Sequence, residues 1–234
     1  MQAIADIATN IRPGVGSWEP SYQRVRFPTR VRLDDLDTSH PAIMYAVQQA
    51  RAWAGRKRTG YEDASLILSG PYGTGKTHIA KSILWSMILE PDGQPDAAVP
   101  AGRFFMANDL LLKMSSVQDG NGLITSARVG DIIGTAPLVV IDDVGGQQTL
   151  PYVAASDQEQ ERHARYFRFV DHCYTLQTSL IITTNLNLGG GHKSALAQHI
   201  GGRSWDRLCE MAPVGFMVGL DSVPSWRVKS GGRS

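Results

Sequence analysis

The feature that most constrains this chain is a glycine-rich loop, "GPYGTGKT" at residues 70–77, which directly follows the apolar run "SLILS". The loop fits the pattern G-x-x-x-x-G-K-[ST], and a helix-forming segment comes after it. Glycines let backbone N–H groups converge on phosphate oxygens, and the N-terminus of the following helix adds a favourable dipole. A strand, a phosphate loop and a helix in this order predict an α/β fold that binds a nucleotide.

The loop offers several kinds of contact to a nucleotide. Lys76 has the length to reach the β- and γ-phosphates, and the Thr77 hydroxyl is a candidate ligand of Mg²⁺. We therefore expect ATP and Mg²⁺ to bind here. The predicted nucleotide-binding residues are Gly70, Pro71, Tyr72, Gly73, Thr74, Gly75, Lys76, Thr77 and His78.

Two later apolar runs also end in polar side chains. "LVVIDD" at 138–143 ends in paired aspartates, and "LIITTN" at 180–185 ends in an asparagine. Such residues meet at the carboxyl edge of a parallel sheet, beside the phosphate loop. We expect Asp142 to hold Mg²⁺ through its water shell and Asp143 to orient the attacking water. Asn185 is the candidate for sensing the γ-phosphate.

Short apolar runs alternate with helical segments along the chain. This alternation predicts a three-layer α/β fold, in which helices cover both faces of a parallel sheet. Asn108 is expected to cap the helix that begins after it. The expected strands are 65–69, 103–107, 135–146, 179–187 and 214–222, and the main expected helices are 42–55, 76–89, 109–117 and 157–176.

Composition and length limit the function classes. The 234 residues suit one globular domain, residues 40–234, preceded by an arm rich in Pro, Gly and Arg at residues 1–39. The arm is expected to bind a partner or to pack on the core, where residues 27–36 would lie beside the adenine. No apolar run is long enough for a membrane helix, and the N-terminus lacks the layout of a secretory signal. A cytoplasmic protein is therefore expected.

The cysteine spacing and the net charge argue against two further kinds of site. Cys173 and Cys209 stand far apart without metal-ligand spacing, so a zinc site is not expected. The net charge is only +1, and DNA contact would have to come from local patches repeated in an oligomer. The candidate DNA-contacting residues are Lys113, Ser115, Ser116, Arg128 and Lys193.

The order of motifs resembles that of the AAA+ ATPases, and within them the DnaC/IstB-like group of helicase loaders and transposition helper ATPases. The resemblance runs from about residue 27 to residue 229, and the combination of its motifs is more specific than the phosphate loop alone. It rests on "GPYGTGKTHIAKSI", "FFMANDLL", "PLVVIDDVG", "RYFRFVDHCYTLQTSLIITTNL", "GGRSWDRL" and "VGLDSVPSWRVK".

The resemblance implies roles for three arginines. Arg207 falls where such proteins place an arginine finger, offered to the ATP of a neighbouring subunit, and Arg203 lies one helical turn earlier. Arg227 resembles the sensor 2 arginine. For each arginine the alternative is a surface ion pair. Asp143 departs from the Glu that many AAA+ proteins carry, which implies slow turnover, and the short C-terminus implies that no helical lid follows the core.

The resemblance also implies an activity and partners. We expect an ATPase that forms a ring or spiral with DNA, with single-stranded DNA preferred, and loads a replicative helicase. The alternative in the same family is a helper ATPase that coats duplex DNA and recruits a transposase. Two readings from other classes are a small-molecule kinase with a phosphate loop and an ATP switch that does not hydrolyse its nucleotide.

Overall fold

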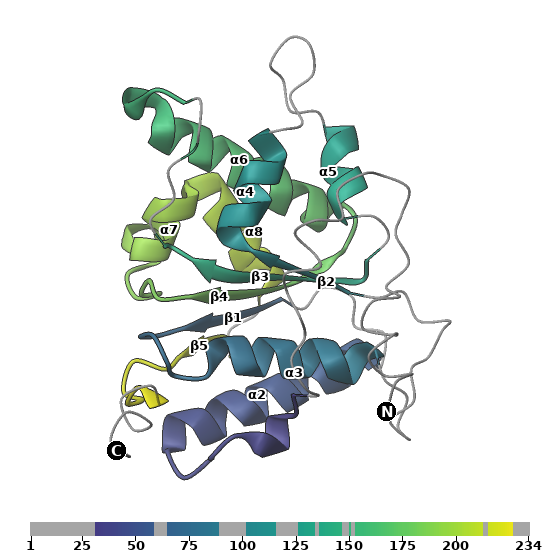
Figure 1. The fold of residues 1–234 in the computed structure, drawn as a ribbon, viewed down its shortest axis with the longest axis vertical. Coiled ribbons are helices and arrows are strands. Elements are labelled where there is room, and N and C mark those ends of the chain that lie inside the picture. The colour runs from purple at the N-terminus through teal and green to yellow at the C-terminus, as the bar shows by residue number, and fades with distance from the viewer. Residues whose placement is uncertain are drawn as a thin grey trace, which may run out of the picture.

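A computed structural model of the chain describes residues 31–58, 65–88, 102–115, 126–133, 136–146, 150, 153–212 and 215–226. Its centre is one sheet of five parallel strands in the order β2-β3-β4-β1-β5. Figure 1 shows this sheet with helices above and below it. The strands are β1 (Leu66–Ser69), β2 (Arg103–Met106), β3 (Leu138–Val144), β4 (Ser179–Thr184) and β5 (Met217–Gly219).

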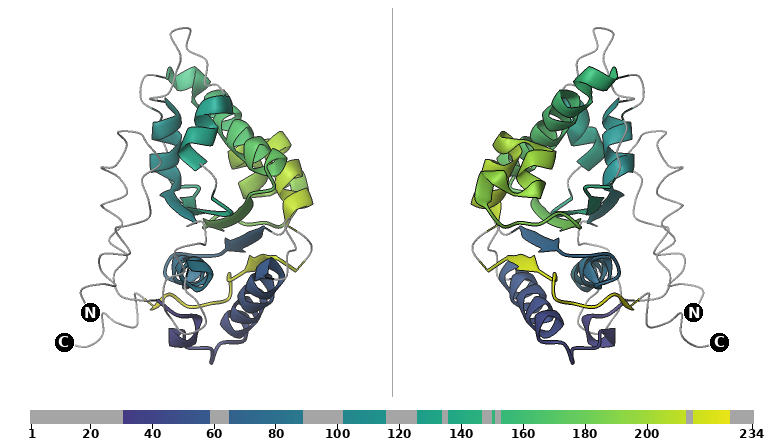
Figure 2. Two further views of the ribbon diagram at one scale, coloured as in Figure 1. Left: turned by 90° about the vertical axis from the view of Figure 1, so that its right-hand side faces the viewer. Right: turned by 90° about the vertical axis from the view of Figure 1, so that its left-hand side faces the viewer.

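The helices form two layers, one on each face of the sheet (Figures 1 and 2). Helices α2 and α3 pack on one face, and the other face carries α4 to α8. The sheet therefore lies in the middle of three layers, and the predicted fold class is confirmed. The helices are α2 (Pro41–Arg58), α3 (Lys76–Ile88), α4 (Ala107–Ser115), α5 (Ser126–Ile133), α6 (Gln158–Thr175), α7 (Ala195–Ile200) and α8 (Gly202–Met211), with short 3-10 helices η2 (Leu33–Asp35), η3 (Ala155–Asp157) and η4 (Gly191–Lys193).

Each face of the sheet has its own hydrophobic core. Trp53 of α2 and Ile83 of α3 are fully buried against one face, and Phe169 of α6 and Leu208 of α8 are fully buried against the other. The middle strands β1, β3 and β4 are buried along almost their whole length because both faces are covered. Fully burying such side chains stabilises the fold by roughly 1.5–3 kcal/mol each. Among the described residues, no helix is long and apolar enough to cross a bilayer.

Several helix limits differ from the sequence prediction. Helix α4 begins at Ala107, directly after β2, so Asn108 lies inside its first turn and the predicted cap is wrong. Helix α2 continues past Gly55 to Arg58. Helix α5 was not predicted, because its stretch "SARVGDII" contains a glycine and small polar residues. No helical lid follows β5 within the described part of the chain, which ends at Trp226.

The segment before α2 packs against the core from residue 31 onward. Leu33 and Leu36 contact the cluster formed by α2, α3 and the sheet. The His78 ring nitrogen Nε2 lies 3.0 Å from the carbonyl oxygen of Arg32. This part of the predicted arm therefore lies beside the start of α3, whereas residues 1–30 are outside the described residues.

Candidate nucleotide-binding site

The glycine loop connects β1 to α3 at the carboxyl edge of the sheet, and its geometry depends on glycine. Gly70 has a φ of +141°, and a Cβ there would lie 2.9 Å from backbone and side-chain atoms of Leu220. Only a glycine therefore allows β5 to pass so close to the loop. The end of β5 is in turn held by a hydrogen bond from the Leu220 N–H to the Ser69 carbonyl, with an N–O distance of 2.7 Å.

Lys76 folds back over this loop. Its ammonium donates hydrogen bonds to the carbonyls of Gly70 at 2.6 Å and Pro71 at 2.7 Å, and the side chain is almost fully buried. The ammonium is thus held at the loop, and Lys76 and the first residues of α3 line the same cavity. This arrangement of donors is the one that phosphate groups require.

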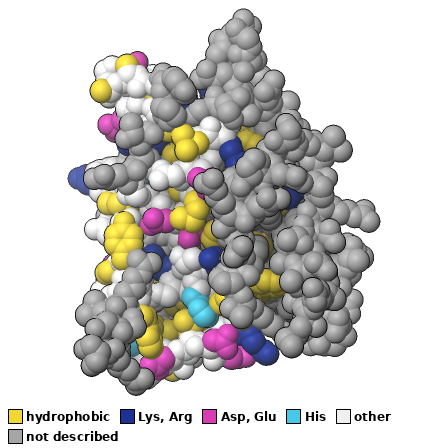
Figure 3. Space-filling model, in the orientation of Figure 1, with side chains coloured by type: hydrophobic (Ala, Val, Ile, Leu, Met, Phe, Trp, Pro, Cys, Tyr) yellow, Lys and Arg dark blue, Asp and Glu magenta, His cyan; other side chains and the backbone are white. Residues whose placement is uncertain are grey.

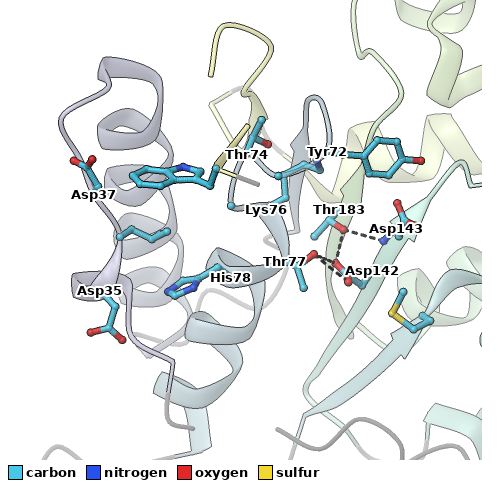
Figure 4. Close-up of a pocket in the computed structure, with 15 residues that line it drawn as sticks. Asp35, Asp37, Tyr72, Thr74, Lys76, Thr77, His78, Asp142, Asp143 and Thr183 are labelled. Atoms are coloured by element: carbon cyan, nitrogen blue, oxygen red, sulfur yellow. Dashed lines mark hydrogen bonds between the residues drawn. The ribbon is translucent and has the colours of Figure 1, made fainter. Parts of the chain in front are cut away.

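The two aspartates at the end of β3 occupy different environments. Asp142 is buried, and its carboxylate accepts hydrogen bonds from Thr77 Oγ1 at 2.8 Å and Thr183 Oγ1 at 2.6 Å. Burial raises the pKa of Asp142 above its ordinary value, and these two hydroxyls and Lys81 partly offset that rise. Figure 4 shows Thr77 and Thr183 converging on Asp142, with the Asp143 carboxylate turned away from them.

Asp143 has an unusual backbone. Its φ is +60°, in the left-handed region, and the register between β3 and β4 shifts between Ile141 and Val144. The Asp143 N–H donates to Thr183 Oγ1 at 2.9 Å, which holds this conformation. Bulges of this kind re-aim side chains beside active sites. The shift therefore separates the directions of two adjacent carboxylates, one toward Thr77 and one toward the open cavity.

These residues surround one cavity of about 590 Å³. That volume lies within the range of small-molecule and cofactor sites. The phosphate loop forms one wall, the aspartates and Thr183 form another, and the η2 segment and Trp226 form a third. The lining residues are Asp35, Leu36, Asp37, Tyr72, Gly73, Thr74, Gly75, Lys76, Thr77, His78, Met106, Asp142, Asp143, Thr183 and Trp226.

The residues present are suited to Mg²⁺. Thr77 Oγ1 and the Asp142 carboxylate are hard oxygen donors on adjacent elements, and Mg²⁺ in nucleotide sites takes few protein ligands beside water and phosphate oxygens. Within the described ranges, no group of three or more His, Cys, Asp or Glu side chains could hold a metal by itself.

Asn185 lies at the end of β4 but does not line this cavity. Its amide Nδ2 donates to the Tyr72 hydroxyl at 2.7 Å, and its Oδ1 is buried without a hydrogen-bond partner in the described structure. Asn185 is therefore tied to the phosphate loop through Tyr72. Tyr72 lines the cavity, so only this side chain separates the Asn185 amide from it.

Neither Arg203 nor Arg207 lines the cavity. Arg207, on α8, lies 3.3 Å from Asp171 and 3.5 Å from Glu210, and its guanidinium stacks 4.3 Å above the Tyr174 ring. Arg203 shares its face of α8, one turn earlier. Arg227 lies outside the described residues.

A comparison with known protein families shows which family this chain belongs to. A family model described as IstB-like ATP binding protein matches residues 57–214, which is more than half of the chain. The chain belongs to this family. The match covers the phosphate loop, both aspartates, Asn185 and the helix that carries Arg207. A comparison with curated proteins gave no match.

Solved structures resemble this IstB-like chain in fold. The DnaC helicase loader is 21% identical, with 78% of this chain and 94% of that chain covered and a TM-score of 0.57. DnaI is 17% identical, with 84% and 90% covered and a TM-score of 0.56. Domain III of the replication initiation protein DnaA from Thermotoga maritima is 13% identical, with 79% and 65% covered and a TM-score of 0.53. The predicted relationship to the DnaC/IstB-like AAA+ ATPases is confirmed.

Sequence reasoning missed several residues around the cavity of this IstB-like protein. Trp226 lines it, and its backbone N–H donates to the Gly73 carbonyl at 3.0 Å. Thr183 joins both aspartates, and Asp37 follows the segment expected beside the adenine. The signal for Thr183 was a hydroxyl at the end of an otherwise apolar buried strand. Trp226 had no such signal, because only the folded chain brings it to the loop.

Proposed function

We propose that this chain is an ATPase whose copies assemble head to tail on DNA, with ATP between neighbouring copies, and that the assembly loads a replicative helicase. The observation that carries the ATP site is the hydrogen-bonded group of Thr77, Asp142 and Thr183 beside the Lys76 ammonium. It joins three elements of the sheet edge at the place where a nucleotide's phosphates would lie.

Each residue of the site has a proposed task. Lys76 and the N–H groups of the loop bind the β- and γ-phosphates, and Thr77 and Asp142 orient the Mg²⁺ shell, which neutralises phosphate charge when it is bound. Asp143 accepts a proton from the attacking water, whose oxygen forms a bond to the γ-phosphorus as the bond to the ADP oxygen breaks. Asn185 holds that water or a γ-phosphate oxygen.

The charge that develops on the γ-phosphate needs a donor from outside the subunit. Arg207 and Arg203 are on α8 and do not line the cavity of their own subunit, so we propose that one of them reaches the nucleotide of a neighbour. Such an arginine can raise hydrolysis by roughly 10³–10⁵-fold. Arg227 is proposed as a further γ-phosphate contact. Hydrolysis would then require assembly, and an isolated subunit would turn over slowly.

The proposed DNA contact comes from repeated local groups. Figure 3 shows Lys and Arg side chains interspersed with Asp and Glu on one face, rather than gathered into a single basic patch. Lys113 is on α4 and Lys193 is in η4, while the side chains of Ser115 and Arg128 and all of Ser116 are outside the described set. A few contacts per copy, repeated along an assembly, are enough to bind a polyanion.

A second candidate function is supported by the family match itself. The matching family is described as IstB-like ATP binding protein. A helper ATPase that coats duplex DNA and recruits a transposase would use the same nucleotide site. The two functions differ in the DNA and the protein partner. Both place the protein in the cytoplasm, with ATP and Mg²⁺ as ligands.

One experiment separates these candidates. We expect an ATP analogue with Mg²⁺ to convert the subunit to oligomers in light scattering, and single-stranded DNA to promote this more than duplex DNA. Affinity capture should then retain a replicative helicase and not a transposase. Lys76→Ala should abolish the oligomers. A subunit that stays monomeric with bound analogue would contradict the proposal, and preference for duplex DNA with capture of a transposase would favour the second candidate.

A further inference from the structure

A second recess lies between α6 and the beginning of α8, and its volume is about 380 Å³. It has no lining residue in common with the nucleotide cavity. None of the residues predicted to contact DNA lines it, although η4, which carries the predicted Lys193, lies next to it. The lining residues that matter here are His163, Phe167, Arg168, Gly201, Arg203 and Ser204.

The floor of the recess is a helix N-terminus that no side chain caps. Gly201 is the N-cap of α8 and has a φ of +87°, whereas the N-terminus of α7 is capped by Ser194 Oγ, which accepts from the Ala197 N–H at 3.1 Å. A Cβ at Gly201 would lie 3.0 Å from the His163 ring, so glycine keeps this end open. The first N–H groups of α8 are therefore available to an anion.

Ser204 gives an independent indication of a ligand. The side chain lines the recess in the first turn of α8 and is fully buried. Its Oγ has no hydrogen-bond partner in the described part of the chain. A buried hydroxyl without a partner is costly, and native proteins seldom keep one unless something binds there. A phosphate oxygen in the recess would accept the hydrogen bond that Ser204 lacks.

Two arginines line the recess, and neither has a counter-charge among the described residues. Neither Arg168 nor Arg203 makes a hydrogen bond or ion pair with another described residue, and the Arg203 guanidinium lies 5.7 Å above the Phe167 ring. The neighbouring acids are engaged elsewhere. Glu159 lies 3.8 Å from His163 Nε2, and Asp206 lies 2.9 Å from His192 Nε2. No acid in the described part of the chain pairs with Arg168 or Arg203.

We propose that this recess binds a phosphate of the DNA backbone, a proposal that rests on the DNA binding of the proposed function. Two guanidiniums, uncapped N–H groups and a free hydroxyl are the donors that a phosphodiester accepts. A recess receives a group that projects from its partner, as backbone phosphates do. The γ-phosphate of a neighbour is enclosed by its own loop and requires a projecting side chain instead.

The surroundings of the recess favour an extended polyanion over a single small anion. A Cβ atom at Gly202 would lie 3.6 Å from His192 Nδ1. The 3-10 helix η4, which carries His192 and Lys193, therefore borders the recess. The next phosphate along a strand would meet this edge. The recess thereby gives each copy one fixed phosphate contact in spite of the near-neutral net charge.

The test uses the full chain and fluorescence anisotropy with a labelled single-stranded oligonucleotide, over a range of salt, with an ATP analogue present. Arg168→Gln should weaken DNA binding about tenfold and reduce the slope of log affinity against log salt by about 0.7, the value for one phosphate contact. Arg51→Gln is the matched control, because Arg51 lies on α2 and pairs with Asp34 at 2.6 Å. It should leave both quantities near those of the natural chain.

Ser204→Ala separates a binding role from a structural one. Removal of an unpartnered buried hydroxyl should leave the melting temperature equal or higher, while DNA affinity falls about threefold. Light scattering in the same series should show unchanged analogue-driven assembly for Arg168→Gln. If Arg168→Gln weakens assembly while the copies that still assemble bind DNA as the natural chain does, the recess serves the neighbouring nucleotide and the proposal is wrong.

The remaining outcomes are also decisive. If the natural chain binds DNA and both Arg168→Gln and Ser204→Ala bind it equally well, the recess is not a phosphate site, while the proposed function stands. If the natural chain binds no DNA under any nucleotide condition, the proposed function fails and this inference fails with it.

Discussion

The Thr77 hydroxyl lies 2.8 Å from the Asp142 carboxylate, although 65 positions separate the two residues in the sequence. This hydrogen bond joins the first turn of α3 to the end of β3. Thr183 completes the group from β4 at 2.6 Å. The bond fixes the distance between the two oxygen donors proposed for Mg²⁺, so the site is arranged before a nucleotide enters.

Asp142→Asn should stabilise the protein and disable its Mg²⁺ response. Burial raises the pKa of Asp142, so the folded chain binds this proton more tightly than the unfolded chain. The ionised group therefore costs stability once the pH exceeds the pKa of the unfolded state, and the cost is absent below it. We expect urea denaturation to show a gain in the free energy of unfolding near neutral pH that shrinks toward pH 4.

The same variant should lose the increase in ATP-analogue affinity that Mg²⁺ gives, because an amide cannot supply the carboxylate charge. Thr183→Ser is the control, since it retains the hydroxyl that donates to Asp142. An Asp142→Asn protein that is less stable near neutral pH, with its Mg²⁺ response intact, would show that the carboxylate serves the fold alone.

Trp226 should contact the base of the nucleotide. It lines the cavity, and its backbone N–H donates to the Gly73 carbonyl, which holds this residue beside the loop. Stacking on an aromatic ring is worth roughly 1–3 kcal/mol per base, and Trp226→Ala should weaken ATP-analogue binding about tenfold. Binding should also change tryptophan emission in the natural chain. Trp53→Phe, a change in the core, should retain that emission change, and its full retention in Trp226→Phe would contradict the contact.

The ion pair between Arg207 and Asp171 should break when Arg207 contacts the nucleotide of a neighbouring subunit. The pair is partly exposed at 3.3 Å, and such a pair is worth about 0–1 kcal/mol. Asp171→Asn should therefore lower the protein concentration needed for half-maximal ATP hydrolysis by up to about fivefold. Glu159→Gln, on the same helix, is the control. A higher concentration requirement in Asp171→Asn would mean that the pair positions Arg207 for its task.

The fold was predictable because each strand is a short apolar run bounded by polar or glycine residues. The loop from Gly70 to Thr77 and the aspartates after β3 carry their chemistry in local sequence, so their positions at one sheet edge followed from the topology of a parallel sheet. Other residues of the cavity could not be predicted from the sequence, because only tertiary contacts bring them to it. Trp226 and Asp37 reach the cavity from opposite ends of the described chain.

Other differences have local causes. Helix α4 starts at Ala107 because the chain turns into it directly from β2, which leaves no room for an Asn108 cap. The left-handed Asp143 follows from the bulge between β3 and β4, and no propensity of the sequence "IDDVG" indicates it. Arg168 and Arg203 lie on different helices, α6 and α8, and only the packing of these helices brings them to one recess.

The most direct test of a nucleotide shared between two copies is ATP hydrolysis by mixed variants. Asp143→Asn and Arg207→Ala should each reduce turnover by at least about a hundredfold, with ATP-analogue binding retained. In an equimolar mixture, about a quarter of the head-to-tail interfaces combine an intact Asp143 with an intact Arg207, and activity should recover in that proportion. Co-assembly with no recovery above the sum of the separate variants would contradict the account.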